Sequence, residues 1–286
     1  LKRALTTLEE GEEWLLEPKQ LGDDPCAWSP SIKLGVKPGS WFHLTECFGP
    51  VLGLMRADDL DHAIELQNAT AYGLTGGIHS LDDDEVERWL GRVQVGNAYV
   101  NRHITGAVVQ RQPFGGWKRS TVGGGAKAGG PGYVPQFARI TGGTVDGLSS
   151  FASAWADLRT AHDPSGLRAE SNVLCTVPVG GMAVRHDGSD DAALAVLRRA
   201  AQVTGVRLVE SDARSESVEA FVRRLHGVER ARVIGLLDDA ARRAIRTLDL
   251  ALLDDAPVAD GAIELRRWVR EQAISRTRHR HGRLLD

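Results

Sequence analysis

Apolar segments and turn-forming segments alternate in a regular order through the first part of this chain. The alternation predicts strands at residues 51–55, 74–79 and 95–101 and helices at residues 60–70 and 82–93. A connection between parallel strands needs a helix to cross over the sheet, so this order predicts an α/β unit with parallel strands.

The ends of these elements carry recognisable signals. Asp58 and Asp59 precede the first predicted helix and Ser80 precedes the second, and all three are residue types that cap helix N-termini. Before this unit, the sequence predicts a short helix at residues 1–14 and a strand at residues 41–44.

A second alternating series occupies the end of the chain. The predicted strands are 173–177, 182–184, 206–210, 232–236 and 250–253, and the predicted helices are 190–203, 216–225, 239–248 and 261–275. This is the pattern of a small doubly wound sheet. No G-x-G-x-x-G follows a strand there, and the pair Gly180 and Gly181 precedes a strand, so this part is not expected to bind a dinucleotide.

The two series are separated by a stretch of small and polar residues with one possible helix at residues 151–158. The chain is therefore predicted to have a first domain at residues 1–140, a linker at 141–170 and a C-terminal α/β domain at 171–286. Residue 1 is leucine and the chain holds two methionines, so it is expected to be a piece of a longer polypeptide.

A glycine-rich segment, residues 105–131, follows the last strand of the first unit. Eight of its 27 residues are glycine, so it cannot build a core of its own. The backbone amides of Gly106 and Ala107 are candidates for an anion site, because glycine lets N–H groups approach a ligand closely. A mobile linker is the alternative, although Val108 and the Pro113-Phe114 pair favour a fixed shape.

Composition excludes several classes of protein. With 42% hydrophobic and 26% charged residues the chain is expected to be globular and cytoplasmic, and its net charge of −3 gives no field that would attract nucleic acid. No apolar run is long enough for a membrane span. Cys26, Cys47 and Cys175 show no spacing typical of a disulfide framework or a metal site.

Several short motifs resemble the C-terminal half of the catalytic domain of NAD-dependent aldehyde dehydrogenases. They are ECFGPV at 46–51, YGLT at 72–75, VN at 100–101 and PFGG at 113–116, followed by Lys118 and Ser120. TGAVV at 105–109, QPFGG at 112–116 and KAGGP at 127–131 are similar to the branch that oxidises L-glutamate γ-semialdehyde, the pyrroline-5-carboxylate dehydrogenases. The C-terminal α/β part is similar to the C-terminal extension of bifunctional proline utilization A proteins.

This resemblance implies a role for five residues. Glu46 would accept hydrogen bonds from the ribose hydroxyls of NAD, and Phe48 would pack against the ribose next to the nicotinamide. The amides of Gly106 and Ala107 would bind the α-carboxylate of the substrate, and Phe114 would line the path of the aldehyde chain.

The resemblance also implies what lies elsewhere. The cysteine nucleophile and the carboxylate base of the family are expected upstream of Leu1, so this chain alone is expected to be inactive and the intact protein to form a homo-oligomer. Cys47 is expected to be a small buried hydrophobe. Two alternatives stay open: an aldehyde dehydrogenase of another substrate class, and a non-catalytic lid or oligomerisation module, which suits residues 171–286.

Overall fold

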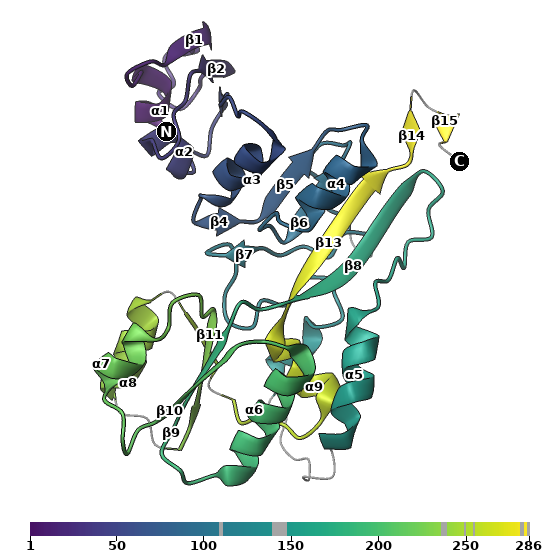
Figure 1. Ribbon diagram of the computed structural model, residues 1–286. Helices are drawn as coiled ribbons and strands as arrows, with labels where there is room; N and C mark the ends of the chain where they lie inside the picture. The colour runs from purple at the N-terminus through teal and green to yellow at the C-terminus, as the bar shows by residue number, and fades with distance from the viewer. Residues whose placement is uncertain are drawn as a thin grey trace.

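The computed structural model describes residues 1–108, 111–138, 148–235, 239–248, 250–253, 255–280 and 283–284. The N-terminal lobe contains α1 (Lys2–Thr6), β1 (Glu13–Leu16), β2 (Ser31–Leu34), α2 (Trp41–Leu44) and β3 (Val51–Gly53). The three strands form a small sheet in the order β1-β2-β3 at the top of the molecule in Figure 1.

Two predictions for this lobe were wrong. The helix predicted at 1–14 ends at Thr6, because the backbone is already extended at Thr7 with a φ of −125° and a ψ of 131°. Further on, Gly11 has a φ of 87°, and the Glu12 carboxylate lies 2.9 Å from the buried ammonium of Lys33. The strand predicted at 41–44 is helix α2, which Ser40 caps by accepting a hydrogen bond from the backbone N–H of His43.

The predicted α/β unit is confirmed. It contains α3 (Leu60–Asn68), β4 (Tyr72–Gly73), β5 (Thr75–Ile78), α4 (Asp83–Leu90) and β6 (Asn97–Val100). Strands β5 and β6 are parallel neighbours, and the two helices pack on them through a core that includes Ile64, Val86 and Trp89. Asp59 caps α3 as predicted, whereas α4 is capped by Asp82 and not by Ser80.

The sheet of this unit is completed by two long strands from the end of the chain, β8 (Glu170–Pro178) and β13 (Val269–Thr277). The strand order is β5-β6-β13-β8, with β13 parallel to β6 and antiparallel to β8. Figure 1 shows β8 and β13 running side by side toward β6. This sheet therefore crosses the predicted boundaries at 140 and 170, which stay predictions as domain limits.

The helix predicted at 261–275 was wrong over most of its length. Helix α9 (Gly261–Glu264) and the 3₁₀ turn η3 (Leu265–Trp268) are short, and the chain then extends as β13. The strand is favoured because it lies between β6 and β8 and pairs its backbone groups with both, which outweighs local helix propensity.

A second sheet, β10-β9-β11-β12, lies in the lower half of Figure 1 with all its strands parallel. Its strands are β9 (Met182–His186), β10 (Leu208–Asp212), β11 (Arg230–Ile234) and β12 (Ala251–Leu253), and its helices are α6 (Asp191–Thr204), α7 (Val218–Arg223) and α8 (Asp239–Thr247). Met182 and Val184 pack in the core that contains α6, whereas Ala183 packs in the core that contains α7 and α8. A doubly wound sheet is confirmed, but the strand predicted at 173–177 was assigned to it wrongly, because these residues are part of β8 in the first sheet.

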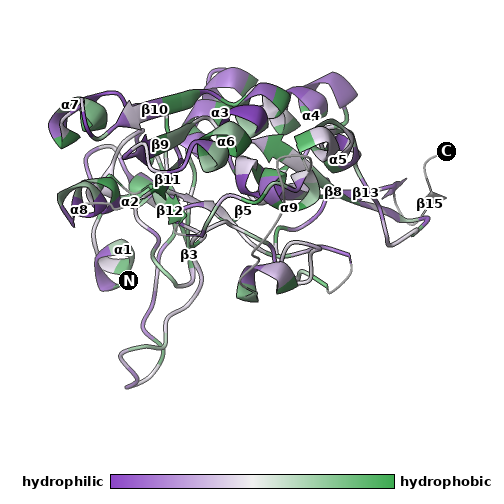
Figure 2. Cartoon of the chain, turned by 90° about the horizontal axis from the view of Figure 1, so that it is seen from below, coloured by the Kyte–Doolittle hydropathy of each residue, from purple (hydrophilic) through white to green (hydrophobic). Residues whose placement is uncertain are grey.

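The remaining elements connect these parts. They are β7 (Trp117–Lys118), the 3₁₀ turn η1 (Val134–Phe137), α5 (Ser150–Arg159), β14 (His279–Arg280) and β15 (Arg283–Leu284). Helix α5, predicted inside the linker, packs so closely on α9 that a Cβ on Gly261 would lie 2.6 Å from Phe151 Cα. The helices carry both hydrophilic and hydrophobic residues (Figure 2), as expected of helices with one buried side.

No helix among the described residues is long and apolar enough to cross a membrane. Over the same residues, no group of three or more His, Cys, Asp and Glu side chains is arranged to hold a metal ion.

Candidate functional site

The glycine-rich segment leaves the first sheet at the carboxyl end of β6. Asn101 makes this exit with a φ of 55°, in the left-handed region that asparagine tolerates. Its side chain donates to the carbonyl of Ser80 at 2.8 Å and accepts from the N–H of Ser80 at 3.0 Å. The segment therefore starts at the edge where open α/β sheets bind ligands.

Gly106 and Ala107 lie in an exposed part of this segment, and each carries a backbone N–H. Gly106 has a φ of 81°, and a Cβ there would meet no heavy atom closer than His103 Nε2 at 3.9 Å, so the backbone angle and not space requires glycine. Both residues are exposed, and neither N–H has an acceptor among the residues that the structure describes. Adjacent free amides of this kind can accept an anion.

The next backbone N–H along the segment, that of Val108, already donates a hydrogen bond within the protein. Gln112 Oε1 accepts from the N–H of Val108 at 2.8 Å. The other end of this buried side chain donates to Asn172 Oδ1 at 2.8 Å and to Ser275 Oγ at 3.2 Å. Since Asn172 lies on β8 and Ser275 on β13, the C-terminal part of the chain anchors the candidate anion site.

Phe114 is held on both sides. Its N–H and carbonyl pair with the carbonyl and N–H of Ala128, both at 2.9 Å. The side chain of Asn97 donates to the carbonyl of Pro113 at 3.1 Å and accepts from the N–H of Gly115 at 3.2 Å. The Phe114 ring nevertheless stays 39% exposed. The described part of the segment is thus a fixed loop with an available aromatic face, and not a linker.

Lys127 holds this loop in place through hydrogen bonds on its buried side. Its side chain is fully buried, and Nζ donates to Asn97 Oδ1 at 3.1 Å and to the carbonyl of Gly115. Its N–H donates to Glu271 Oε2 at 3.0 Å. Burial lowers the pKa of Lys127 to about 7, although the charges of Glu271 and Cys175 oppose that shift.

Sequence reasoning missed four anchors of this loop: Asn172, Ser275, Glu271 and Lys127. The first three lie on β8 and β13, far along the chain, with no motif around them. Lys127 was visible as the first residue of KAGGP, and a lysine among glycines was the signal that could have identified it.

The loop packs directly against the sheet at Gly96. A Cβ on Gly96 would overlap the carbonyl oxygen of Gly115 and lie 2.8 Å from Gly116 Cα. We expect Gly96→Ala to lower the free energy of unfolding by about 1–3 kcal/mol, because backbone on both sides cannot yield without strain. Gly124→Ala is the control, since a Cβ on Gly124 meets nothing within 4 Å. Urea unfolding of both variants measures the difference, and equal stabilities would contradict the packing.

Glu46 and Phe48 lie between α2 and β3 in the N-terminal lobe. Glu46 is exposed, and its carboxylate has no hydrogen-bond or ion-pair partner in the described part of the chain. The Phe48 side chain is 85% exposed, which is unusual for a large aromatic. Both side chains are free to contact a ligand, and a carboxylate with open lone pairs fits a pair of ribose hydroxyls.

The other residues of this segment are less open. The Cys47 thiol is half-buried and donates to the carbonyl of Thr45 at 3.5 Å. No hydrogen bond or ion pair between described residues joins Glu46 or Phe48 to Gly106, Ala107 or Phe114, so their meeting at one ligand stays a prediction.

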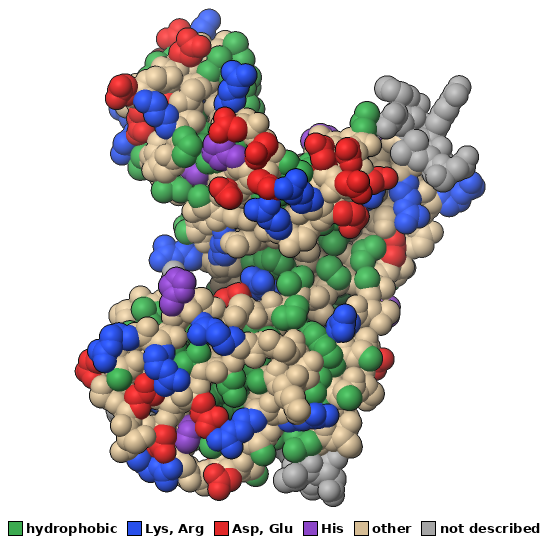
Figure 3. All heavy atoms as spheres, viewed as in Figure 1, with side chains coloured by type: hydrophobic (Ala, Val, Ile, Leu, Met, Phe, Trp, Pro, Cys, Tyr) green, Lys and Arg blue, Asp and Glu red, His purple; other side chains and the backbone are tan. Residues whose placement is uncertain are grey.

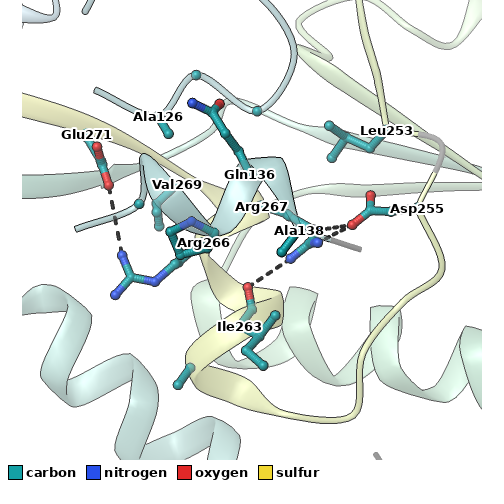
Figure 4. A pocket seen from close by; sticks show the side chains of 15 residues that line it. Ala126, Gln136, Ala138, Leu253, Asp255, Ile263, Arg266, Arg267, Val269 and Glu271 are labelled. Carbon is teal, nitrogen blue, oxygen red and sulfur yellow. Dashed lines mark hydrogen bonds and ion pairs between the residues drawn. The ribbon is translucent and has the colours of Figure 1, made fainter. Parts of the chain in front are cut away.

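A cavity of about 340 Å³ lies between the glycine-rich segment and the C-terminal part (Figure 4). Its charged side chains form internal pairs: Arg266 Nη1 lies 3.9 Å from Glu271 Oε1, and Arg267 binds Asp255 and the carbonyl of Ile263. The five predicted site residues do not line this cavity. The charges of its described lining residues are matched.

Charged side chains lie near the switch point of the second sheet. Open α/β sheets bind ligands where strand order reverses, here between β9 and β11. A Cβ on Gly188 would collide with the guanidinium of Arg214, which pairs with Asp212 at 2.7 Å, and one on Gly235 would collide with the carboxylate of Asp187. These charged side chains therefore lie against the backbone at this edge of the sheet.

Comparisons with known proteins found a protein family and several relatives that are similar to parts of this chain. Residues 3–141 match the Aldehyde dehydrogenase family. The 1-pyrroline-5-carboxylate dehydrogenases of Bacillus thuringiensis (strain Al Hakam) and Bacillus cereus (strain AH187) are each 44% identical over 115 residues, which cover 40% of this chain and 22% of theirs.

A solved structure of Proline Utilization A (PutA) from Corynebacterium freiburgense is similar to this chain with a TM-score of 0.87 and 42% sequence identity. The similarity covers 99% of this chain and 31% of that protein, so it includes β8, β13 and the second sheet. The chain spans less than a third of the length of each of these relatives. Residues 3–141 are therefore similar to a segment of an aldehyde dehydrogenase family domain, and the α/β fold of the chain is similar to that of the matching region of PutA.

Proposed function

We propose that the intact protein that carries this chain is an NAD-dependent L-glutamate γ-semialdehyde dehydrogenase, which oxidises the semialdehyde to L-glutamate in proline catabolism. The observations that carry the proposal are the N–H groups of the exposed residues Gly106 and Ala107, which have no acceptor among the described residues, and the partly exposed Phe114 in the same segment. The names of the Bacillus relatives and of PutA support the same chemistry.

The substrate of this reaction carries an α-carboxylate at one end and an aldehyde at the other. The N–H groups of Gly106 and Ala107 bind the carboxylate, and hydrogen bonds to an ionised acceptor are about twice as strong as neutral ones. Phe114 packs against the methylene chain between the two ends. The three residues thereby fix the distance from the carboxylate to the aldehyde, which is the positioning that catalysis needs.

The N-terminal lobe binds the cofactor in this proposal. The Glu46 carboxylate accepts hydrogen bonds from two ribose hydroxyls, and Phe48 packs against the ribose next to the nicotinamide. NAD⁺, when bound, supplies the hydride acceptor. The cysteine nucleophile and the carboxylate base lie upstream of Leu1, and the intact protein is a cytoplasmic homo-oligomer.

The C-terminal part has a supporting role in the proposal. Asn172 and Ser275 hold Gln112, which in turn binds the amide next to Ala107, and Glu271 holds Lys127 under the loop. Residues 171–286 thus position the substrate loop, which is a more specific task than that of a lid or an oligomerisation module.

Steady-state kinetics of the intact protein test the proposal. With NAD⁺ we expect kcat/KM for L-glutamate γ-semialdehyde to exceed that for an aldehyde of the same length without the α-carboxylate by at least about a hundredfold, because the second aldehyde leaves the N–H groups of the site unpaired. The isolated 286-residue chain is the control, and it is expected to produce no NADH. Equal kcat/KM values for the two aldehydes, or turnover by the isolated chain, would contradict it.

A further inference from the structure

Arg102 lies between β6 and the glycine-rich segment. Charged side chains of both signs lie exposed on the face of the molecule shown in Figure 3. Arg102 differs from these, because its side chain is only 12% exposed and its guanidinium lies 5.6 Å from the centre of the Tyr99 ring. Arg102 Nη1 donates to Ser275 Oγ at 2.6 Å and lies 3.5 Å from the Glu170 carboxylate. The cation is therefore held where β6 meets β13 and β8.

The direction of the hydrogen bonds at Ser275 follows from the chemistry of its neighbours. A guanidinium has N–H donors and no acceptor, so Ser275 Oγ accepts from Arg102. The side-chain nitrogen of Gln112 also donates to Ser275 Oγ, at 3.2 Å. The single hydroxyl proton of Ser275 is thus directed to Asn172 Oδ1, which lies 2.7 Å away.

The side-chain amide of Asn172 continues in the same direction. Its Oδ1 accepts from Ser275 Oγ and from Gln112 Nε2, the latter at 2.8 Å. Its Nδ2 donates to Glu170 Oε2 at 3.1 Å. The hydrogen bonds therefore run one way, from a cation that only donates, Arg102, to a carboxylate that only accepts, Glu170.

This direction decides which end of the Gln112 side chain faces the glycine-rich segment. Ser275 Oγ and Asn172 Oδ1 both accept from its amide nitrogen, so its oxygen is left for the N–H of Val108, at 2.8 Å. Val108 follows Ala107 directly in the sequence. A buried polar network in which each member has a partner favours one arrangement of the backbone that it contacts.

We propose that Arg102 is a positioning residue for the backbone that carries the N–H groups of Gly106 and Ala107. It acts through Ser275, because its donors direct the hydroxyl proton of Ser275 away from Gln112. The inference rests on the proposed function only where this backbone binds the α-carboxylate of the substrate.

Amide hydrogen exchange of the intact protein tests the positioning without reference to catalysis. Arg102→Gln removes the charge and introduces an oxygen that can accept from Ser275. We expect the N–H of Val108 to exchange about tenfold faster in this variant than in the wild type, because the orientation of its acceptor is no longer fixed. Unchanged exchange at Val108 would overturn the proposal.

A double-mutant cycle tests the route through Ser275. Arg102→Gln and Ser275→Ala are each expected to raise the KM for L-glutamate γ-semialdehyde about tenfold and to leave the KM for NAD⁺ unchanged. The double variant is expected to match the single variants within about twofold, because both substitutions break the same link. A KM about a hundredfold above the wild type in the double variant would show independent effects and would overturn the proposal.

Arg185→Gln is the matched control. Arg185 is buried and also donates to a serine, to Ser211 Oγ at 2.7 Å, but it lies in the second sheet. We expect this substitution to leave both the exchange at Val108 and the KM for the semialdehyde unchanged, and effects equal to those of Arg102→Gln would overturn the proposal. A wild-type enzyme with equal kcat/KM for aldehydes with and without the α-carboxylate would instead contradict the proposed function, while the exchange at Val108 would still decide the role of Arg102.

Discussion

The Lys127→Met variant of the intact enzyme is expected to lose about a hundredfold in kcat/KM for L-glutamate γ-semialdehyde. Lys127 Nζ holds the carbonyl of Gly115 and Asn97 Oδ1, which together fix the backbone on both sides of Phe114. Methionine fills a similar volume but donates no hydrogen bond, and a shift of about 1 Å in a substrate-positioning group can cost about a hundredfold in rate.

Steady-state kinetics with each substrate varied separately measure this effect. The KM for the semialdehyde is expected to rise while the KM for NAD⁺ stays unchanged, because Glu46 and Phe48 lie in a different lobe. Lys19→Met, at an exposed lysine, is the control and is expected to match the wild type. A folded Lys127→Met enzyme with wild-type kcat/KM would show that the lysine does not position the loop.

The same lysine predicts a pH dependence of stability. Burial lowers the pKa of Lys127 to about 7 in the folded chain, against about 10.4 for lysine in an unfolded chain. Between these values the unfolded chain binds a proton that the folded chain does not, so stability rises with pH there, by at most about 1.4 kcal/mol for each pH unit. Urea unfolding at about pH 7 and pH 9 is expected to show this rise in the wild type and a smaller rise in Lys127→Met. Identical pH profiles would contradict the burial of a titrating lysine.

Gly106→Ala is expected to have the second large effect on activity. The φ of 81° at Gly106 costs an alanine about 1–3 kcal/mol, so the backbone will relax and turn the N–H groups of residues 106 and 107 away from the carboxylate. We expect kcat/KM for the semialdehyde to fall by roughly 10- to 100-fold, the loss of one or two charge-assisted hydrogen bonds.

Two comparisons separate this effect from general strain. Gly22→Ala also places alanine at a positive φ, 65°, in an open loop, and it is expected to leave kcat/KM unchanged. An aldehyde without the α-carboxylate should be oxidised by Gly106→Ala as well as by the wild type. If Gly106→Ala lowered kcat/KM for both aldehydes equally, this would show that the N–H groups of residues 106 and 107 do not bind the α-carboxylate.

Much of the fold could be predicted because hydrophobic period and helix caps are local. The parallel unit from β5 to β6 and the doubly wound second sheet both follow from such patterns. The strand β13 could not be predicted in this way, because residues 269–275 gain their extended shape from β6 and β8, which lie far away in sequence. Helix α2 was missed for a different reason: four residues are too few to show a period, and Ser40 sets their conformation.

For the candidate site, too, the residues in local motifs could be predicted and the residues that depend on distant contacts could not. Glu46, Phe48, Gly106, Ala107 and Phe114 were found because they lie in short contiguous motifs. Their supports were not, because a buried polar network such as Gln112, Asn172 and Ser275 joins three distant segments and leaves no periodic trace in any of them. Leaving a buried polar group of this network without a partner costs free energy, so the network favours one arrangement of the three segments. The partners become visible only in the folded chain.

A crystal structure of the intact protein with L-glutamate and NAD⁺ is the most direct test of the proposed site. The measured quantities are the distances from the α-carboxylate oxygens to the N atoms of Gly106 and Ala107, and from the Glu46 carboxylate to the ribose hydroxyls. We predict all of them at about 2.7–3.2 Å. An α-carboxylate bound away from these two amides, or a ribose out of reach of Glu46, would contradict the proposed function.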